Sequence, residues 1–168
     1  MIDHFQNIYH HQAGQYEQLV AREDYQGNIL TALQKIRALS GLDVVEMGAG
    51  TGRLTCMLAP LVKSILAFDA SEHMLDVAVA KLKQMGATNW QVQVGDNRAL
   101  PVEDGAADLS IAGWSFGHAT SWAAGRWPME IGQAVAEMKR VLRPGGMAII
   151  LETMGTGFET PRPPNQAL

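Results

Sequence analysis

A glycine-rich turn between a buried strand and a helix constrains this chain more than any other feature. Residues 44–47 are apolar apart from Glu46, as in a strand of a parallel sheet, and Gly-x-Gly-x-Gly follows at 48–52. Glycine permits tight turns and lets the main chain approach a ligand closely. Arg53 stands where the dinucleotide fingerprint has its third glycine, which argues against a nicotinamide or flavin cofactor. An ordinary strand-to-helix turn is the alternative interpretation.

The rest of the chain alternates apolar runs with segments of helical periodicity. Further strands are expected at 64–68, 90–94, 108–113 and 147–152, and residues 114–125 are expected to form a loop. This alternation predicts an α/β fold with a doubly wound parallel sheet. Residues 143–146 are expected to form a turn before the last strand.

The sequence divides into three regions that together form one structural domain. We expect a helical N-terminal cap over 1–40, an α/β core over 41–152 and a Gly/Pro-rich tail over 153–168.

Acidic residues follow two of the predicted strands. Asp69 ends the strand at 64–68, where a carboxylate can accept hydrogen bonds from a ribose diol. Asp96 follows the strand at 90–94, where it can accept from an adenine amino group. The alternatives are an acid that stabilises a helix N-terminus and an aspartate of an ordinary turn. Since parallel strands end at one edge of the sheet, both carboxylates are expected near the glycine turn.

Composition bears on nucleic-acid binding, membrane insertion, cellular location and metal binding. The net charge is −4, which argues against a domain that grips nucleic acid. The longest apolar run, at 147–151, is far shorter than the ~20 residues that cross a bilayer. The single cysteine, Cys56, suits a reducing cytoplasm. His4, His10 and His11 have no clearly spaced acidic partner, so no metal site is expected.

Four motifs in order carry a resemblance to a known family. They are Glu46-Met47-Gly48-Ala49-Gly50-Thr51-Gly52, Asp69, Gly95-Asp96 and Leu142-Arg143-Pro144-Gly145-Gly146. In this order the chain resembles a class I S-adenosylmethionine-dependent methyltransferase of the small-molecule type found in ubiquinone and menaquinone biosynthesis. The resemblance implies a Rossmann-like fold, S-adenosyl-L-methionine as cofactor, S-adenosyl-L-homocysteine as product and a small-molecule methyl acceptor.

The resemblance also implies roles for individual residues. The cofactor-binding residues that it implies are Glu46, Gly48, Ala49, Gly50, Asp69, Ala70, Met74, Asp96, Asn97, Trp114 and Ser115. Glu46 is expected to orient the turn and the cationic amino end of the cofactor, and Trp114 and Ser115 are expected beside the transferred methyl group. His118 and Glu152 are the candidates for a general base, a group that matters only where the acceptor must lose a proton. A loop histidine and a capping acid are the alternatives.

Members of this family usually continue past the fifth strand with a helix and an antiparallel pair of strands. Here a Gly/Pro-rich tail follows, so the sheet is expected to lack those strands and to end at 147–151. An apolar edge strand is a template for pairing. We therefore expect a homodimer through this edge, or cover from the tail. A cofactor-binding or scaffolding domain without turnover is the alternative to an active enzyme, and a nicotinamide-dependent enzyme is a more distant one.

Overall fold

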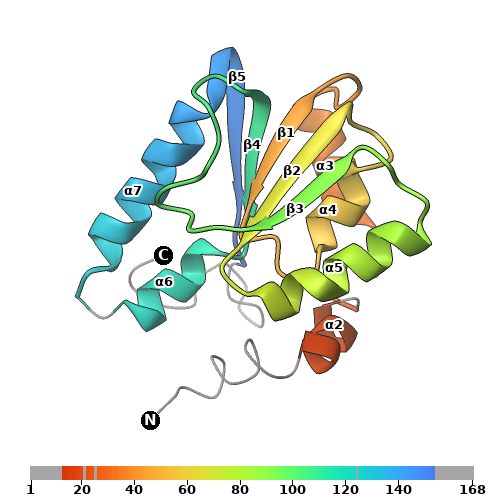
Figure 1. Ribbon diagram of the computed structural model, residues 1–168, viewed down its shortest axis with the longest axis horizontal. Coiled ribbons are helices and arrows are strands. Elements are labelled where there is room, and N and C mark those ends of the chain that lie inside the picture. The colour runs from red at the N-terminus through yellow and green to blue at the C-terminus, as the bar shows by residue number, and fades with distance from the viewer. Residues whose placement is uncertain (1–12, 21, 25, 124, 154–168) are drawn as a thin grey trace, which may run out of the picture.

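A computed structural model describes residues 13–20, 22–24, 26–123 and 125–153, and these form an α/β sheet structure (Figure 1). The five strands are β1 (Asp43–Met47), β2 (Ser64–Asp69), β3 (Trp90–Val94), β4 (Ala107–Gly113) and β5 (Leu142–Leu151). Their order is β3-β2-β1-β4-β5, and all neighbouring pairs are parallel. The chain winds outward from β1 to β3 and then returns to the other side of β1, which confirms the predicted doubly wound sheet.

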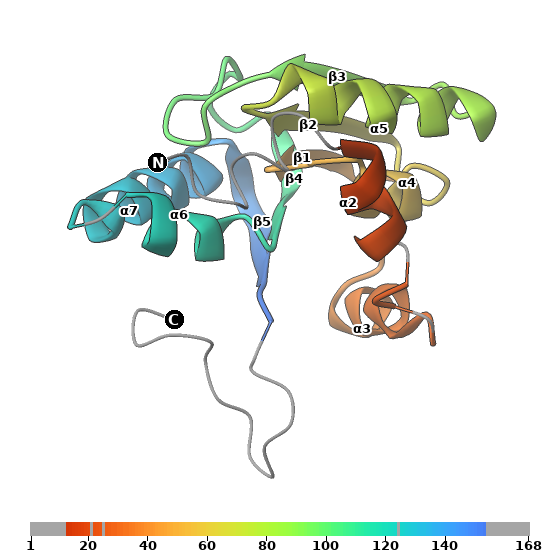
Figure 2. The same cartoon turned by 90° about the horizontal axis from the view of Figure 1, so that it is seen from below.

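Helices cover both faces of this sheet (Figures 1 and 2). They are α2 (Ala13–Val20), α3 (Asn28–Ile36), α4 (Arg53–Leu58), α5 (Glu72–Gln84), α6 (Phe116–Trp122) and α7 (Trp127–Arg140). Helix α7 packs on β4 and β5, whereas α4 and α5 pack on β2. Ser71 caps α5 by accepting a hydrogen bond from the Met74 N–H at 3.4 Å. Within the part of the chain that the structure describes, no helix is long and apolar enough to span a membrane.

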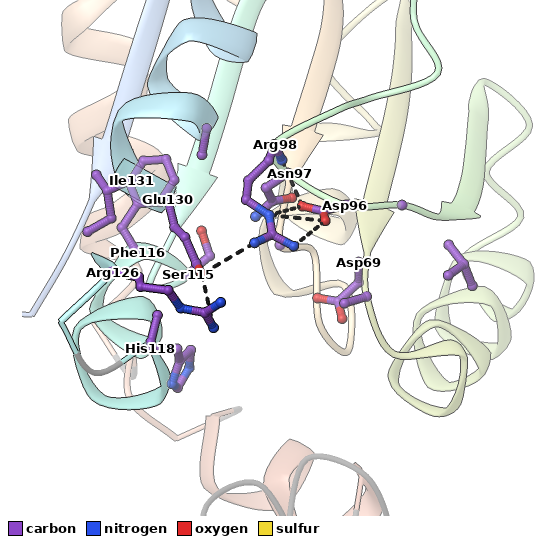
Figure 3. A pocket seen from close by; sticks show the side chains of 16 residues that line it. Asp69, Asp96, Asn97, Arg98, Ser115, Phe116, His118, Arg126, Glu130 and Ile131 are labelled. Carbon is purple, nitrogen blue, oxygen red and sulfur yellow. Dashed lines mark hydrogen bonds and ion pairs between the residues drawn. The ribbon is translucent and has the colours of Figure 1, made fainter. Parts of the chain in front are cut away.

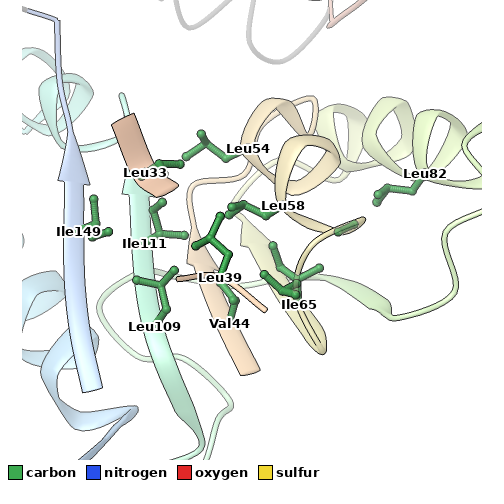
Figure 4. Close-up of a cluster of buried hydrophobic side chains, with 12 residues drawn as sticks. Leu33, Leu39, Val44, Leu54, Leu58, Ile65, Leu82, Leu109, Ile111 and Ile149 are labelled. Atoms are coloured by element: carbon green, nitrogen blue, oxygen red, sulfur yellow. The ribbon is translucent and has the colours of Figure 1, made fainter. Parts of the chain in front are cut away.

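Alternation along the strands creates an apolar core on each face. Val44 of β1 belongs to the core under α3 and α4, whereas Val45 and Met47 belong to the core under α7. Figure 4 shows the first core, whose labelled members are Leu33, Leu39, Val44, Leu54, Leu58, Ile65, Leu82, Leu109, Ile111 and Ile149. Each fully buried leucine or isoleucine stabilises the fold by about 1.5–3 kcal/mol. Each face of the sheet therefore packs into an apolar core, and the ends of the strands are the place to look for a ligand site.

Arg143 joins three segments at the amino ends of the strands, in an arrangement that we call the Arg143 clamp. Its guanidinium contacts the Asp108 carboxylate at 2.8 Å and the Asp43 carboxylate at 3.1 Å, and it donates to the Ala106 carbonyl at 2.7 Å. Hydrogen bonds from Ser64 and Lys63, in that order of importance, lower the pKa of Asp43 to about 2. The clamp fixes the start of β5 against β1 and β4.

Two local predictions are wrong. Residues 114–125 do not form a loop throughout, because helix α6 occupies Phe116–Trp122. The backbone N–H groups of its first two residues donate to the Glu152 carboxylate, 36 and 35 residues further along the chain. The helix therefore begins with a partner that the sequence near residue 116 does not indicate. The turn expected at 143–146 lies inside β5, as the irregularity between the pairs Ala107↔Leu142 and Leu109↔Met147.

The structure describes part of the predicted cap and part of the predicted tail. Helices α2 and α3 belong to the region expected as a cap, and the prediction for residues 1–12 lies outside the described part. The same holds for residues 154–168 of the expected tail.

Candidate active site

A cavity of about 610 Å³ opens where the strands end, beside the point at which the strand order reverses between β1 and β4. This is where open α/β sheets bind ligands, and the size falls in the usual range of roughly 300–1,000 Å³. Its lining residues are Gly48, Asp69, Ala70, Val94, Gly95, Asp96, Asn97, Arg98, Ser115, Phe116, His118, Ala123, Arg126, Glu130, Ile131 and Ala134. The ends of β2 and β3, the turns after β1 and β4, and helices α6 and α7 all contribute to it.

The glycine turn after β1 forms one wall of the cavity. Gly48 has φ +71°, and a Cβ there would collide with the side chain of Ser115. The turn is tied to β2, since Ala49 N–H donates to the Phe68 carbonyl at 2.8 Å and Gly50 N–H donates to Asp69 Oδ2 at 2.8 Å. Only glycine at position 48 combines this backbone angle with this close approach.

Asp69 is a buried carboxylate held in a fixed orientation. Its Oδ2 accepts from Gly50, and its Oδ1 accepts from the Ser71 N–H at 2.9 Å. The side chain is only 2% exposed, yet it lines the cavity. These two bonds fix the orientation of the carboxylate at the cavity.

A row of alternating charges runs along another side of the cavity, from the loop after β3 to α7 (Figure 3). Arg98 pairs with Asp96 at 2.6 Å and with Glu130 at 3.4 Å, and Arg126 reaches Glu130 at 3.6 Å. The hydrogen bonds from Arg98 lower the pKa of Asp96. We call these four residues the charged rim.

Glu46 lies behind the glycine turn. Its side chain is 2% exposed, and its Oε2 accepts from Thr55 Oγ1 of α4 at 2.7 Å. Burial raises the pKa of Glu46 to about 8, and the charge of Asp69 adds to this effect. Glu46 is therefore predominantly a neutral acid at neutral pH.

The two candidate bases occupy different environments. His118 of α6 lines the cavity, and burial lowers its pKa while the charge of Asp69 opposes that shift. Its imidazole is therefore neutral at neutral pH and is able to accept a proton. Glu152 does not line this cavity; its Oε1 accepts from the N–H groups of Phe116 and Gly117 at 2.9 and 3.1 Å.

Trp114 follows β4 in a conformation unusual for its type. Its φ is +56°, in the left-handed region, and its N–H donates to the Leu151 carbonyl at 2.7 Å. The Arg53 guanidinium lies 4.1 Å from the centre of the indole ring and also contacts Glu23 at 2.7 Å. Strain of this kind costs about 1–3 kcal/mol and is concentrated at functional sites.

Only some of the predicted site residues line the cavity. Those that do are Gly48, Asp69, Ala70, Asp96, Asn97, Ser115 and His118. The predicted residues outside its lining are Glu46, Ala49, Gly50, Met74, Trp114 and Glu152. Met74 is 0% exposed.

Sequence reasoning missed the charged side chains Arg98, Arg126 and Glu130 and the apolar side chain Ile131. Arg98 follows Asp96 closely, so its place in a loop after a strand was a usable signal. The others depend on where α6 and α7 lie, which the sequence alone did not indicate.

Comparisons with known proteins agree with this geometry. A model of the family described as "Methyltransferase domain" matches residues 44–146. A demethylmenaquinone methyltransferase of Lactococcus lactis is 30% identical over 124 residues, which are 72% of this chain and 46% of that protein. The Staphylococcus saprophyticus enzyme of the same name is 30% identical over 157 residues, covering 90% of this chain and 61% of its own length.

Solved structures share the fold. A SAM-dependent methyltransferase from Aquifex aeolicus superimposes with a TM-score of 0.66 at 22% identity, over 80% of this chain and 68% of that one. Phosphoethanolamine N-methyltransferase 1 of Haemonchus contortus, solved with phosphoethanolamine and S-adenosylhomocysteine, has a TM-score of 0.62 at 24% identity. The matched region is 74% of this chain and 25% of that one.

A doubly wound sheet with a glycine turn after β1, and with carboxylates after β2 and β3 at a cavity beside the switch point, defines the class I methyltransferase fold. The chain belongs to the methyltransferase domain family. A solved structure described as a putative S-adenosyl-L-methionine-dependent methyltransferase of Methanococcus maripaludis is 26% identical, with a TM-score of 0.63 over 74% of this chain and 54% of that one, and it supports S-adenosylmethionine as the cofactor. The chain spans about half the length of the first two curated relatives that it matches.

Proposed function

We propose that this protein transfers a methyl group from S-adenosylmethionine to a small-molecule acceptor. The observation that carries the proposal is the meeting of Gly48, Asp69 and Asp96 in one cavity at the switch point. These residues come from three separate strand ends, and each has the chemistry that one part of a nucleoside-containing ligand requires.

The residues present fit this cofactor. Asp69, held by backbone N–H groups, would accept from the ribose hydroxyls, and Asp96 with the Asn97 backbone would meet the base. Gly48 lacks the Cβ that would crowd Ser115, so the turn and Ser115 would hold the amino-acid part. When bound, S-adenosylmethionine supplies an activated methyl group on a sulfonium. Five further residues are proposed to flank the cofactor: Ala49, Gly50, Ala70, Met74 and Trp114. Glu46 is proposed to support the glycine turn through its bond with Thr55.

The chain itself contributes mainly binding and orientation. Well-oriented reactants gain up to about 7–11 kcal/mol from proximity alone. His118, neutral and beside the cavity, is the proposed base for an acceptor that loses a proton, a contribution of roughly 10²–10⁴-fold. Glu152, the other candidate, acts in this proposal by holding the start of α6, the helix that carries His118.

The acceptor is proposed to lie against α6 and α7. Phe116, Ile131 and Ala134 give this side of the cavity an apolar surface. A small apolar molecule suits it better than nucleic acid, which the net charge of −4 also disfavours. We also propose a cytoplasmic location, which the single cysteine supports. A core over 41–152 with a cap over 1–40 and a tail over 153–168 remains our proposed domain arrangement.

A second candidate function is a cofactor-binding domain without turnover. The observation that favours it is the position of β5 at the edge of the sheet in the described part of the chain, with Ile150 45% exposed. An exposed apolar edge is a place for another strand to pair.

Calorimetry with S-adenosylhomocysteine tests the proposal. Hydrogen bonds to charged groups are worth about 1.5–3 kcal/mol, so Asp69→Ala should weaken binding by at least roughly tenfold. Glu72→Ala, in the exposed first turn of α5, should leave the affinity unchanged. Equal affinities of the two variants, or binding of NAD instead, would refute the assignment.

Turnover distinguishes the two candidate functions. Formation of S-adenosylhomocysteine is measured with a panel of small acceptors, for the natural chain and for His118→Asn. An active enzyme forms S-adenosylhomocysteine with at least one acceptor. His118→Asn should lower the rate of methyl transfer to an acceptor that must lose a proton. Tight cofactor binding with no product from any acceptor would favour the binding domain.

A further inference from the structure

The Arg98 side chain donates hydrogen bonds to the Asp96 carboxylate, which is the group proposed to accept from the adenine of the cofactor. Its backbone N–H and its Nε each donate to Asp96 Oδ1 at 2.9 Å, and its Nε and Nη2 reach Oδ2 at 3.1 and 2.6 Å. A carboxylate has about four acceptor sites. These contacts take up both oxygens of Asp96, so an incoming amino group meets a competitor already in place.

A second carboxylate lies within reach of the same guanidinium. Glu130 of α7 is 3.4 Å from Arg98 Nη1, close enough for an ion pair, although only the bonds to Asp96 meet hydrogen-bond geometry. The Glu130 side chain is 16% exposed, against 49% for Asp96. An ion pair is less screened at the more buried site, so Glu130 is an adequate alternative partner.

The backbone around Arg98 is anchored independently of this pair. Leu100 N–H donates to Glu137 Oε2 at 2.8 Å, and Arg140 donates to the Leu100 and Val102 carbonyls at 3.1 and 2.6 Å. The loop after β3 is therefore held to α7 from position 100 onward. An exchange of partners by Arg98 requires a rotation of its side chain and no movement of this anchored segment.

We propose that Arg98, which reaches both carboxylates, gives up its side-chain bonds to Asp96 and strengthens its pair with Glu130 when the cofactor binds, and that this exchange sets cofactor affinity. The inference rests on the proposed function, because it takes Asp96 as the acceptor for the amino group of the base. Arg98 is thus an affinity-determining residue that acts through Asp96, and Glu130 is the group that receives it. Figure 3 shows the guanidinium between the two carboxylates.

A double-mutant cycle tests the exchange, with S-adenosylhomocysteine as the calorimetric probe. Exposed ion pairs are worth about 0.2–1 kcal/mol, so Arg98→Ala should tighten binding by about 1.5- to 5-fold. Glu130→Gln removes the alternative partner and should weaken binding by a similar factor. In the Arg98→Ala background, Glu130→Gln should have no effect. Arg37→Ala is the matched control, because Arg37 is a partly exposed arginine outside the cavity lining, and its side chain donates to the Gly145 carbonyl.

The outcomes separate this inference from the proposed function. If the natural chain binds no S-adenosylhomocysteine, the proposed function is refuted, and the proposed exchange of Arg98 is refuted as well. If it binds but Arg98→Ala weakens the complex, or if Glu130→Gln has the same effect in both backgrounds, only the exchange is overturned. Thermal melts check the fold of each variant, and Arg98→Gln, which removes the charge and keeps much of the side chain, repeats the cycle if alanine destabilises the loop.

Discussion

Replacing Glu46 by glutamine should make the protein less sensitive to rising pH. Glu46 is a fully buried acid whose pKa burial raises from 4.5 to about 8. Unfolding exposes the group to water and returns its pKa to the ordinary value. Between the two values the unfolded chain releases a proton that the folded chain retains, so the unfolded state gains as pH rises.

The sign and size follow from the two pKa values. The stability associated with the neutral Glu46 is fully present below pH 4.5 and is lost progressively as pH rises toward about 8. Each pH unit inside this window corresponds to about 1.4 kcal/mol. Between pH 5.5 and 7.5 this single group should therefore lower the free energy of unfolding by about 2.7 kcal/mol.

Urea unfolding of the natural chain and of Glu46→Gln at pH 5.5, 6.5 and 7.5 measures the effect. Glutamine keeps an oxygen that accepts from Thr55 Oγ1 and has no proton to release in this range. The stability of the variant relative to the natural chain should rise steadily with pH. Glu72→Gln, at an exposed position, should follow the natural chain at every pH. If the difference between Glu46→Gln and the natural chain is constant across the three pH values, the reasoning is refuted.

Two further predictions concern the ends of the fold. Asp43→Asn should lower the free energy of unfolding by about 1–2 kcal/mol at pH 7, since it weakens the contacts of Asp43 with Ser64, Lys63 and Arg143. Because the pKa of Asp43 is lowered from 3.8 to about 2, this stability is present above 3.8 and lost as pH falls through 2, so denaturation curves of the two proteins should converge in acid. Self-association through the edge of β5 should appear as a dimer in light scattering at micromolar concentration, and Ile150→Lys should abolish it. A monomer at all concentrations would show that the edge is tolerated.

The strand pattern was predictable because it depends on local sequence. The strand predicted at 90–94 is β3 as observed, and the alternation of strands with helices gave the doubly wound order. Helix α6 was not predictable in the same way, because its N–H groups are satisfied by Glu152 from beyond β5. Nothing near residue 116 signals that partner.

The site was predictable at the carboxyl ends of the strands. Asp69 is the last residue of β2 and Asp96 follows β3 after one glycine, and both line the cavity. Glu46 lies inside β1, and strand alternation places it with Val44 on the face that α4 covers, beside Thr55. Glu130 escaped prediction because its place depends on how α7 crosses the sheet, a property that no motif encodes.

The Arg143 clamp and the cavity lie at opposite ends of the same strands. The clamp contacts that hold β5 against β1 and β4 are thus physically separate from the charged rim. Substitutions in the charged rim are therefore expected to leave the clamp and its contribution to stability intact, so that ligand preference could change without loss of the clamp. The fold is in this sense evolvable: its stability and its specificity can change one at a time.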